Sequence, residues 1–240
     1  MRIIFGTPFL VHSEVVAIAD THIGVEHHLR KAGFALESNA AWYAKEAVRI
    51  GRENRAGILL HLGDLKHTIG RWSGKERLEV LKFIEILQDW FSEVVVIRGN
   101  HDGGLVLPDS VKHCKSYVHK GLGFLHGHCY PEPALGGSRT IVCGHIHPCV
   151  RFRDGLGRIK TWRCWLLAEV NRKFREKFGL EKARRIVVMP SASDFVGMRE
   201  VNTPALNGFL VSRELMSGRK SEVYLFDGTF LGSMEHVDAR

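Results

Sequence analysis

Three dense apolar segments in the first hundred residues each end in a cluster of polar residues. They cover residues 14–20, 57–64 and 94–100 and consist mostly of valine, isoleucine, leucine and alanine before the polar residues begin. Short runs of this kind are typical of strands that are buried on both faces of a parallel sheet. The stretches between them, 39–54 and 73–91, carry apolar side chains at helical spacing. The resulting order, β-α-β-α-β, predicts an α/β fold.

The second half of the chain contains short apolar segments with few long helical patterns between them. We expect these segments to form the strands of a second sheet. They cover residues 123–128, 140–147, 185–191, 208–212 and 222–228. The chain has 240 residues, 45% of them apolar, and shows no repeat, linker or obvious boundary. These features predict a single domain over residues 1–240.

The N-terminus and the cysteines both indicate an intracellular setting. Residues 1–16 contain one early arginine and a broken apolar stretch without a small-residue cleavage pattern, and no run of about 18 apolar residues occurs anywhere. The five cysteines are an odd number without CxxC spacing, which argues against a disulfide framework or a zinc ribbon. We therefore expect a cytoplasmic protein with reduced thiols and no membrane segment.

The net charge of +8 is concentrated in one segment. Residues 151–185 contain twelve lysines and arginines and four acidic residues, so this basic segment accounts for the whole excess. A basic surface beside a binding site attracts phosphate backbones, and exposed aromatic rings stack on bases. The aromatic residues expected to take this role are Trp162, Trp165, Phe174 and Phe178. The alternative is a solvated helix face whose aromatic residues are buried.

Each polar cluster lies at the carboxyl end of an expected strand, where open α/β sheets form their binding sites. The clusters contain carboxylate and imidazole groups, one amide and no thiolate, a donor set that suits Mn, Fe or Zn. Glycines beside nearly every cluster allow tight turns around such a site. The clusters are Asp20-Thr21-His22, Gly63-Asp64, Gly99-Asn100-His101-Asp102, His126-Gly127-His128 and Gly144-His145-Ile146-His147.

The order of these clusters, D-x-H, G-D, G-N-H-D, H-G and G-H-x-H, resembles the calcineurin-like metallophosphoesterase superfamily over residues 15–148. The resemblance implies a four-layer α/β/β/α sandwich with two mixed sheets and two divalent metal ions. Mn is the favoured metal, with Fe and Zn as alternatives. The resemblance also assigns seven metal ligands. These are Asp20, His22 and His147 for one ion, Asn100, His126 and His145 for the other, and Asp64 as the bridge.

The same resemblance implies a metal-dependent phosphodiesterase mechanism. A hydroxide held between the two ions attacks phosphorus, and His101, outside the metal shell, protonates the leaving oxygen. Asp102 would hold the His101 ring in its tautomer, and a structural role in the turn is the alternative. Because the family pattern places the ligand directly before glycine, we favour His126 over His128. Among the histidines outside the clusters, His67, in GDLKH, is a candidate for the cleft.

A narrower resemblance lies outside the five clusters. Residues 19–34, LGDLKH, GHIHPCV and residues 189–202 are similar to the ligase-associated DNA damage response endonucleases and their archaeal single-domain relatives, some of which associate with helicases. In that branch the last of these motifs packs near the site. The basic segment, with RCWLLAEVNRKFREKFGLEKARR, is longer than expected for the bacterial form.

These features favour a nuclease that acts on single-stranded or flap DNA in repair or processing, with a helicase or a DNA ligase as a protein partner. Candidate substrate contacts near the clusters are Arg30, Arg98, His128 and Arg139. Two other functions are alternatives. One is hydrolysis of small phosphoesters such as cyclic or dinucleotides, for which a closed pocket is expected. The other is a nucleic-acid-binding accessory subunit with weak catalysis.

Overall fold

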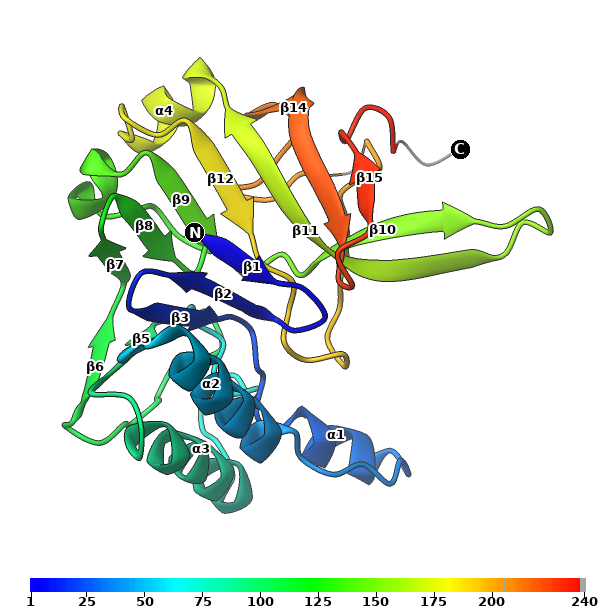
Figure 1. Ribbon diagram of the computed structural model, residues 1–240. Coiled ribbons are helices and arrows are strands. Elements are labelled where there is room, and N and C mark those ends of the chain that lie inside the picture. Colours follow the sequence, from blue (N-terminus) through cyan, green and yellow to red (C-terminus); the bar gives the residue numbers. More distant parts are fainter. Residues whose placement is uncertain (205, 238–240) are drawn as a thin grey trace. The chain divides into compact units, whose positions relative to one another are not determined.

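The computed structural model describes residues 1–204 and 206–237, and the chain divides into two compact units (Figure 1). Unit 1 consists of Met1–Ile4, Phe9–Lys115 and Ala192–Val196. Unit 2 consists of Phe5–Pro8, Ser116–Ser191 and Gly197–Arg240. Each unit has its own sheet and its own apolar core, and each is described by itself. The assignment of residues 1–240 to a single domain stays a prediction.

The sheet of unit 1 has six strands, and its central part is parallel. Its strands, in spatial order, are β1 (Arg2–Ile4), β2 (Phe9–His12), β3 (Val15–Ile18), β4 (Ile58–His61), β5 (Glu93–Ile97) and β6 (Val111–Cys114). The first two strands are antiparallel to their neighbours, whereas β3 to β6 are parallel. The three strands predicted in the first hundred residues are confirmed as β3, β4 and β5. Every residue of β3 is buried, as expected for a strand covered on both faces.

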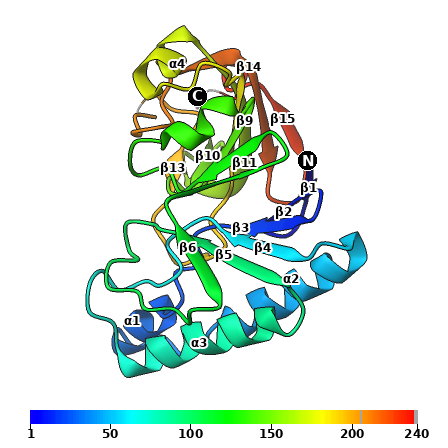
Figure 2. The same cartoon turned by 90° about the vertical axis from the view of Figure 1, so that its left-hand side faces the viewer.

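Two long helices lie along one side of this sheet (Figure 2). They are α2 (Ala40–Asn54) and α3 (Gly74–Gln88), and both confirm helices predicted from apolar spacing. Ala47 and Ile50 of α2 and Phe83 of α3 pack into one core with the strands. The α3 helix begins where the Ser73 hydroxyl accepts a hydrogen bond from the Glu76 amide at 3.2 Å. A shorter helix, α1 (Val25–Lys31), follows the first polar cluster.

The sheet of unit 2 is also mixed. Its path runs β13 (Arg199–Glu200), β10 (Pro148–Arg153), β11 (Ile159–Val170), β12 (Arg185–Val188), β9 (Thr140–Cys143), β8 (Leu122–Leu125) and β7 (Ser116–His119). Two more strands, β14 (Met216–Leu225) and β15 (Phe230–Gly232), extend it beside β11. The β8, β9 and β12 strands are parallel, while β10, β11 and β14 pair in antiparallel fashion. A 3-10 helix, η1 (Pro133–Gly137), precedes β9.

One strand prediction for unit 2 is wrong. Residues 208–212 do not form a strand and contribute only an isolated bridge between Asn207 and Ser212. In the basic segment, the alternative of a solvated helix face applies only to α4 (Arg172–Phe178), because most of the segment forms the long strand β11. Residues 159–165, IKTWRCW, are rich in β-branched and aromatic side chains, which favour a strand.

Burial also separates the four aromatic residues expected to stack on bases. Trp165, Phe174 and Phe178 are buried in the core of unit 2, so they offer no face to a base. Trp162 is 55% exposed. Trp162 and Trp165 are three residues apart on β11, so they point to opposite faces of the strand. The amphipathic α4 turns both of its phenylalanines toward the core. Among these four residues, Trp162 is therefore the one that stays a candidate for stacking.

The predicted α/β class with two mixed sheets is confirmed. Four α-helices accompany the sheets in the described part of the chain, α1 to α3 in unit 1 and α4 in unit 2. Among these helices, none combines the length and the apolar character that crossing a membrane requires.

Candidate active site

The predicted ligands of unit 1 follow three neighbouring parallel strands. Asp20 and His22 come after β3, Asp64 after β4, and Asn100 after β5. Because parallel strands end at the same edge of the sheet, their following loops meet. Main-chain hydrogen bonds join two of these loops, from the Asp20 amide to the Gly63 carbonyl at 3.1 Å and from the His22 amide to the Asp64 carbonyl at 3.0 Å.

Backbone geometry marks the ligand positions independently of their side chains. Among the residues that the structure describes, eight residues other than glycine have a positive φ. Such a conformation costs about 1–3 kcal/mol, and it clusters at functional sites, where the surroundings hold it in place. Five of the eight are predicted metal ligands. They are Asp20, His22, Asp64, His145 and His147, with φ of 55°, 44°, 53°, 73° and 47°.

The donor atoms in unit 1 have a spacing that suits one metal ion. Asp20, His22 and Asp64 each offer an atom within 4.8 Å of the others, and all three residues are buried. His22 Nε2 lies 3.6 Å from Asp64 Oδ2. Two ligands that are each about 2.0–2.2 Å from the same ion lie roughly this far apart. A buried set of carboxylate and imidazole groups therefore fits a divalent cation.

Asp64 is held in place by a glycine and a main-chain donor. The His101 amide donates to Asp64 Oδ1 at 2.8 Å. At Gly99, an added Cβ would lie 2.2 Å from both the amide nitrogen and Oδ1 of Asp64, which is inside the van der Waals contact distance. The glycine that opens the GNHD cluster is thus required by the close approach of two loops, a reason that the sequence pattern alone did not give.

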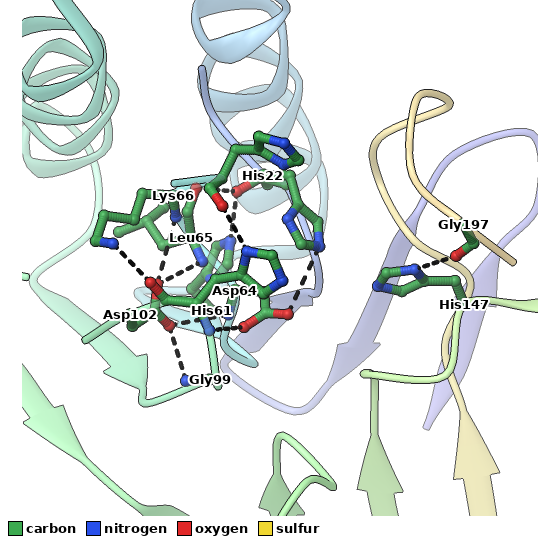
Figure 3. Close-up of polar contacts among 12 residues, drawn as sticks. His22, His61, Asp64, Leu65, Lys66, Gly99, Asp102, His147 and Gly197 are labelled. Carbon is green, nitrogen blue, oxygen red and sulfur yellow. Dashed lines mark hydrogen bonds and ion pairs between the residues drawn. The ribbon is translucent and has the colours of Figure 1, made fainter. Parts of the chain in front are cut away.

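Asp102 binds the backbone of the neighbouring loop (Figure 3). Its Oδ2 accepts from the amides of Gly99 and Asp64, at 2.8 and 2.9 Å, and its Oδ1 accepts from those of Leu65 and Lys66, at 3.0 and 3.3 Å. The residue is buried. This network corrects the prediction that the main task of Asp102 is to orient the His101 ring. Its contacts are those of the structural alternative, since one carboxylate fixes two ligand loops by four amides.

The His101 ring is oriented by a carbonyl. Its Nδ1 donates to the His67 carbonyl at 2.5 Å, which leaves Nε2 as the nitrogen free to act on a substrate. The ring centroid lies 4.7 Å from that of His22 and 5.8 Å from that of His67. His101 is partly exposed, as a group that must reach substrate should be. The expected role of His101 as the general acid stays a prediction.

Two residues of the GDLKH loop, Lys66 and His67, lie close to His101. Lys66 is fully buried, and its Nζ donates to the carbonyls of His101, Gly70 and Thr68, the first two at 2.6 and 3.3 Å. Burial lowers the pKa of Lys66, against the opposing effect of nearby carboxylates. Burial also lowers the pKa of His67, as do His28 and His101, so a neutral imidazole is favoured there. His67, the candidate for the cleft, has its ring next to that of His101.

A broad basin in unit 1 opens beside this loop. It has a volume of about 1810 Å³ and lies between α1 and the first turns of α3. Its carboxylates are engaged: Glu79 lies 3.1 Å from His27 Nε2, while Glu76 accepts from the amides of His67 and Thr68 at 3.1 and 2.8 Å. The cationic residues that line the basin are Arg30, Lys31, Arg71, Lys75 and Arg77. The basin therefore carries a surplus of positive charge.

The predicted ligands of unit 2 lie after β8 and β9, at the carboxyl ends of parallel strands. His126 and His145 offer donor atoms within 4.8 Å of each other, and their ring centroids are 4.9 Å apart. His126 is buried, whereas His128 is partly exposed and lies 5.2 Å from the His126 ring. This arrangement favours His126 as the ligand and leaves His128 at the rim.

His147 has the support expected of a metal-binding histidine. Its Nδ1 donates to the Gly197 carbonyl at 2.6 Å, so the ring presents Nε2. The Arg199 amide donates to the His147 carbonyl at 3.1 Å. Gly197 and Arg199 belong to residues 189–202, the motif expected to pack near the site. Residues 192–196 of the same motif belong to unit 1, where the Ser193 amide donates to the Asp20 carbonyl at 3.2 Å.

The three arginines expected to contact substrate have different positions. Arg30 lines the basin of unit 1. Arg98 is exposed directly after β5, at the same strand end as Asn100. Arg139 precedes β9, whereas His145 follows that strand, so the two lie at opposite ends. The expectation for Arg139 is therefore corrected. Although Arg139 is close to His145 in the sequence, the length of the β9 strand separates the two residues in space.

Comparisons with known proteins agree with this geometry. The profile of the calcineurin-like phosphoesterase family matches residues 13–189. A solved structure of the nuclease MPE from Pseudomonas putida has a similar fold, with a TM-score of 0.55, 20% sequence identity and coverage of 91% of this chain and 88% of that one. A search of curated proteins found no match. The chain belongs to the calcineurin-like phosphoesterase family and is a metal-dependent phosphoesterase.

Proposed function

We propose that this phosphoesterase is a nuclease that cleaves single-stranded or flap nucleic acid, with DNA as the favoured substrate, in DNA repair or processing. The observation that carries the proposal is the basic basin of unit 1. An open, cation-lined basin of about 1810 Å³ suits a polyanionic strand. Small cyclic or dinucleotide esters would instead favour a closed pocket that surrounds them.

Imidazole rings connect this basin with the proposed general acid. His28 lines the basin, and its ring centroid lies 4.9 Å from that of His67. The His67 centroid in turn lies 5.8 Å from that of His101. A phosphate backbone bound in the basin would therefore lead toward the ring that protonates the leaving oxygen.

Seven donors are proposed to hold two divalent ions, of which Mn is favoured. When bound, such ions polarise the phosphoryl group and lower the pKa of water. The protein's own groups then position the reaction. His101 would deliver its proton from Nε2 to the leaving oxygen, because its Nδ1 is held by the His67 carbonyl. The proposed donors are Asp20, His22, Asp64, Asn100, His126, His145 and His147.

The nuclease assignment also draws support from the similar fold of the P. putida protein, which is described as a nuclease. A cytoplasmic location and a helicase or DNA ligase as partner belong to the same proposal. The partner rests on the resemblance of residues 19–34 and 189–202 to the repair-associated branch of the family, and the location rests on five cysteines without the spacing of a disulfide framework.

The proposal is tested by Mn-dependent cleavage of labelled single-stranded DNA beside hydrolysis of bis(p-nitrophenyl) phosphate. The basin variant Arg71→Gln/Lys75→Gln should raise KM for DNA several-fold and leave hydrolysis of the small ester unchanged. The matched control is Lys45→Gln/Lys82→Gln, which removes two exposed cations of unit 1 outside the basin. Hydrolysis of the ester without any cleavage of DNA would contradict the proposed substrate.

A further inference from the structure

The β10 and β11 strands continue beyond their sheet as a two-stranded arm (Figure 1). The β13 strand pairs with β10 only at Pro148 and Cys149, and β14 pairs with β11 only from Cys164 onward. Between these points, residues 150–162 pair as strands only with each other in the described structure. We call these residues the hairpin arm. A two-stranded hairpin of this kind is only marginally stable by itself, so its base needs an anchor.

Asn202 provides this anchor. Its Oδ1 accepts from the Arg151 amide, and its Nδ2 donates to the Arg151 carbonyl, both at 2.9 Å. The same Nδ2 donates to the Val237 carbonyl at 2.8 Å, and Asn202 is buried. One buried amide thus pairs with both main-chain groups of Arg151, at the point where β10 leaves the sheet. The arm therefore extends from a fixed base.

The register of the arm sorts its side chains onto two faces. Phe152 pairs with Lys160, and Trp162 pairs with Val150, so Phe152, Lys160 and Trp162 share one face. Phe152 is 37% exposed and Trp162 is 55% exposed. Arg153 and Ile159 form a pair on the opposite face. Two partly exposed aromatic rings and an exposed lysine therefore lie on one face of the arm.

The cations of the arm divide into engaged and available groups. Arg158 pairs with Asp154 at the turn, at 3.1 Å, and Arg163, at the base of the arm, donates to the Ser191 carbonyl at 2.9 Å. Arg153 and Lys160 are exposed and form no ion pair with any residue that the structure describes. The only acidic residue between 148 and 163 is Asp154. The arm therefore presents unneutralised positive charge on both faces, with Lys160 on the face of the aromatic rings and Arg153 on the opposite face.

We propose that the hairpin arm binds single-stranded nucleic acid outside the catalytic centre, with Phe152 and Trp162 stacking on bases and with Arg153 and Lys160 contacting phosphates. This inference rests on the proposed function and assigns the binding role of the basic segment to the arm instead of α4. Aromatic stacking tolerates any base, and cations track the backbone. A second copy of the chain fits this surface less well, because two such arms would bring like charges together.

The position of the arm predicts which substrates depend on it. The β10 strand begins at Pro148, directly after the predicted ligand His147. At about 3.3 Å per residue along a strand, Phe152 lies roughly 17 Å from His147. A strand several nucleotides long can contact both places, whereas bis(p-nitrophenyl) phosphate cannot. The arm should therefore affect cleavage of long substrates and leave small-ester hydrolysis unchanged.

The test compares binding of labelled oligo(dT) in EDTA with hydrolysis of the small ester in Mn. Phe152→Ala/Trp162→Ala should weaken binding about tenfold or more. Arg153→Gln/Lys160→Gln should weaken it and reduce the slope of log K against log salt by about 1.4, since each lost phosphate contact accounts for ~0.7 on a single strand. Ester hydrolysis should match that of the unaltered protein in both variants.

Matched controls separate the arm from charge and aromatic content in general. Arg172→Gln/Lys173→Gln removes two exposed cations from α4, and Trp42→Ala removes an exposed ring from α2. Both controls should bind oligo(dT) almost as the unaltered protein does. Size-exclusion chromatography with light scattering reports whether the arm variants change the oligomeric state.

The outcomes distinguish the inference from the proposed function. If the unaltered protein cleaves DNA and the arm variants bind as tightly as the controls do, the arm inference is overturned while the nuclease proposal stands. Loss of a dimer in the arm variants would likewise overturn it in favour of self-association. If the unaltered protein hydrolyses the ester but neither binds nor cleaves DNA, the proposed function fails and the inference fails with it.

Discussion

The ligand loops of unit 1 and the hairpin arm of unit 2 are built on opposite principles. The loops hold four buried polar side chains, those of Asp20, His22, Asp64 and Asp102. The carboxylate of Asp102 accepts four main-chain hydrogen bonds. On the arm, Phe152 and Trp162 are exposed.

This contrast assigns the proposed catalytic chemistry to the ligand loops and the proposed binding of long substrates to the hairpin arm. Buried polar groups keep a fixed geometry because any displacement leaves a donor or an acceptor unsatisfied. Exposed rings and cations leave the stability of the fold largely unaffected and are available to a partner. Substitutions in the loops should therefore affect every substrate, whereas substitutions on the arm should affect only long ones. The following predictions test this division.

The largest effect is expected for Asp64→Asn. The change keeps the oxygen that accepts from the His101 amide but removes the negative charge that the proposed metal site needs. Loss of groups that merely support a ligand costs about 10- to 100-fold, so turnover of DNA and of the small ester should both fall by about 10³-fold or more. Steady-state kinetics and metal content check this. A variant that retains activity on either substrate would contradict the role of Asp64.

His101→Ala should reduce DNA cleavage by about 10²- to 10⁴-fold, the usual contribution of a general acid. The loss should be smaller for bis(p-nitrophenyl) phosphate, because p-nitrophenolate leaves readily without a proton. Metal content should match that of the unaltered protein, since His101 lies outside the proposed ligand set. Equal losses on both substrates would show that His101 acts in some other way than by protonating the leaving oxygen.

Gly99→Ala should destabilise the protein by about 1–3 kcal/mol, the usual cost of forcing an added carbon into a packed site. The new Cβ would lie 2.2 Å from Asp64, so both activities should fall as well. Gly103→Ala is the matched control in the same loop, because its Cβ would meet no atom within 4 Å. Urea denaturation of the two variants checks the difference. Similar stabilities would refute the close packing of the two loops.

The smallest effect concerns the base of the arm. Burial, with a contribution from Glu200, raises the pKa of the Cys149 thiol to about 11, from an ordinary value of 9.0. Folding thus favours the neutral thiol, and the stability that this provides is complete below about pH 9 and is lost as the pH rises through 11. The free energy of unfolding should fall over this interval, and less steeply in Cys149→Ala.

Alkylation of the native protein gives an independent measure of the same burial. Cys129 is exposed and should react with iodoacetamide at neutral pH. Cys149 and Cys164, at the base of the arm, are buried and have raised thiol pKa values, so they should react only after unfolding. Rapid labelling of Cys149 in the native state would show that the arm opens at its base.

Much of the fold was predictable from the chain, and the reasons are physical. Residues 14–20, 57–64 and 94–100 form β3, β4 and β5 because a strand buried on both faces requires a continuous apolar run. The β11 strand was not predicted, since its lysines and arginines at one end and its apolar residues at the other give no simple period. Its assignment depends on pairing with β10, β12 and β14, which lie elsewhere in the sequence.

The candidate site was predictable in its residue types and less so in its supporting contacts. Spacing after strand ends located the ligand clusters, because parallel strands bring their ends together. The main contacts of Asp102 could not be predicted, since its partners are the amides of residues 64–66 and 99. The burial of Lys66 could not be predicted either, because the sequence does not distinguish a buried lysine from an exposed one.

The most direct test of the account is cleavage of labelled single-stranded DNA by the unaltered protein and by Asp64→Asn, purified in parallel and assayed with and without Mn. The account predicts that the unaltered protein cuts the strand only with the metal and that the variant does not cut it. Equal cleavage by both proteins, or an intact strand beside rapid hydrolysis of bis(p-nitrophenyl) phosphate, would contradict the claim that this site is a nuclease.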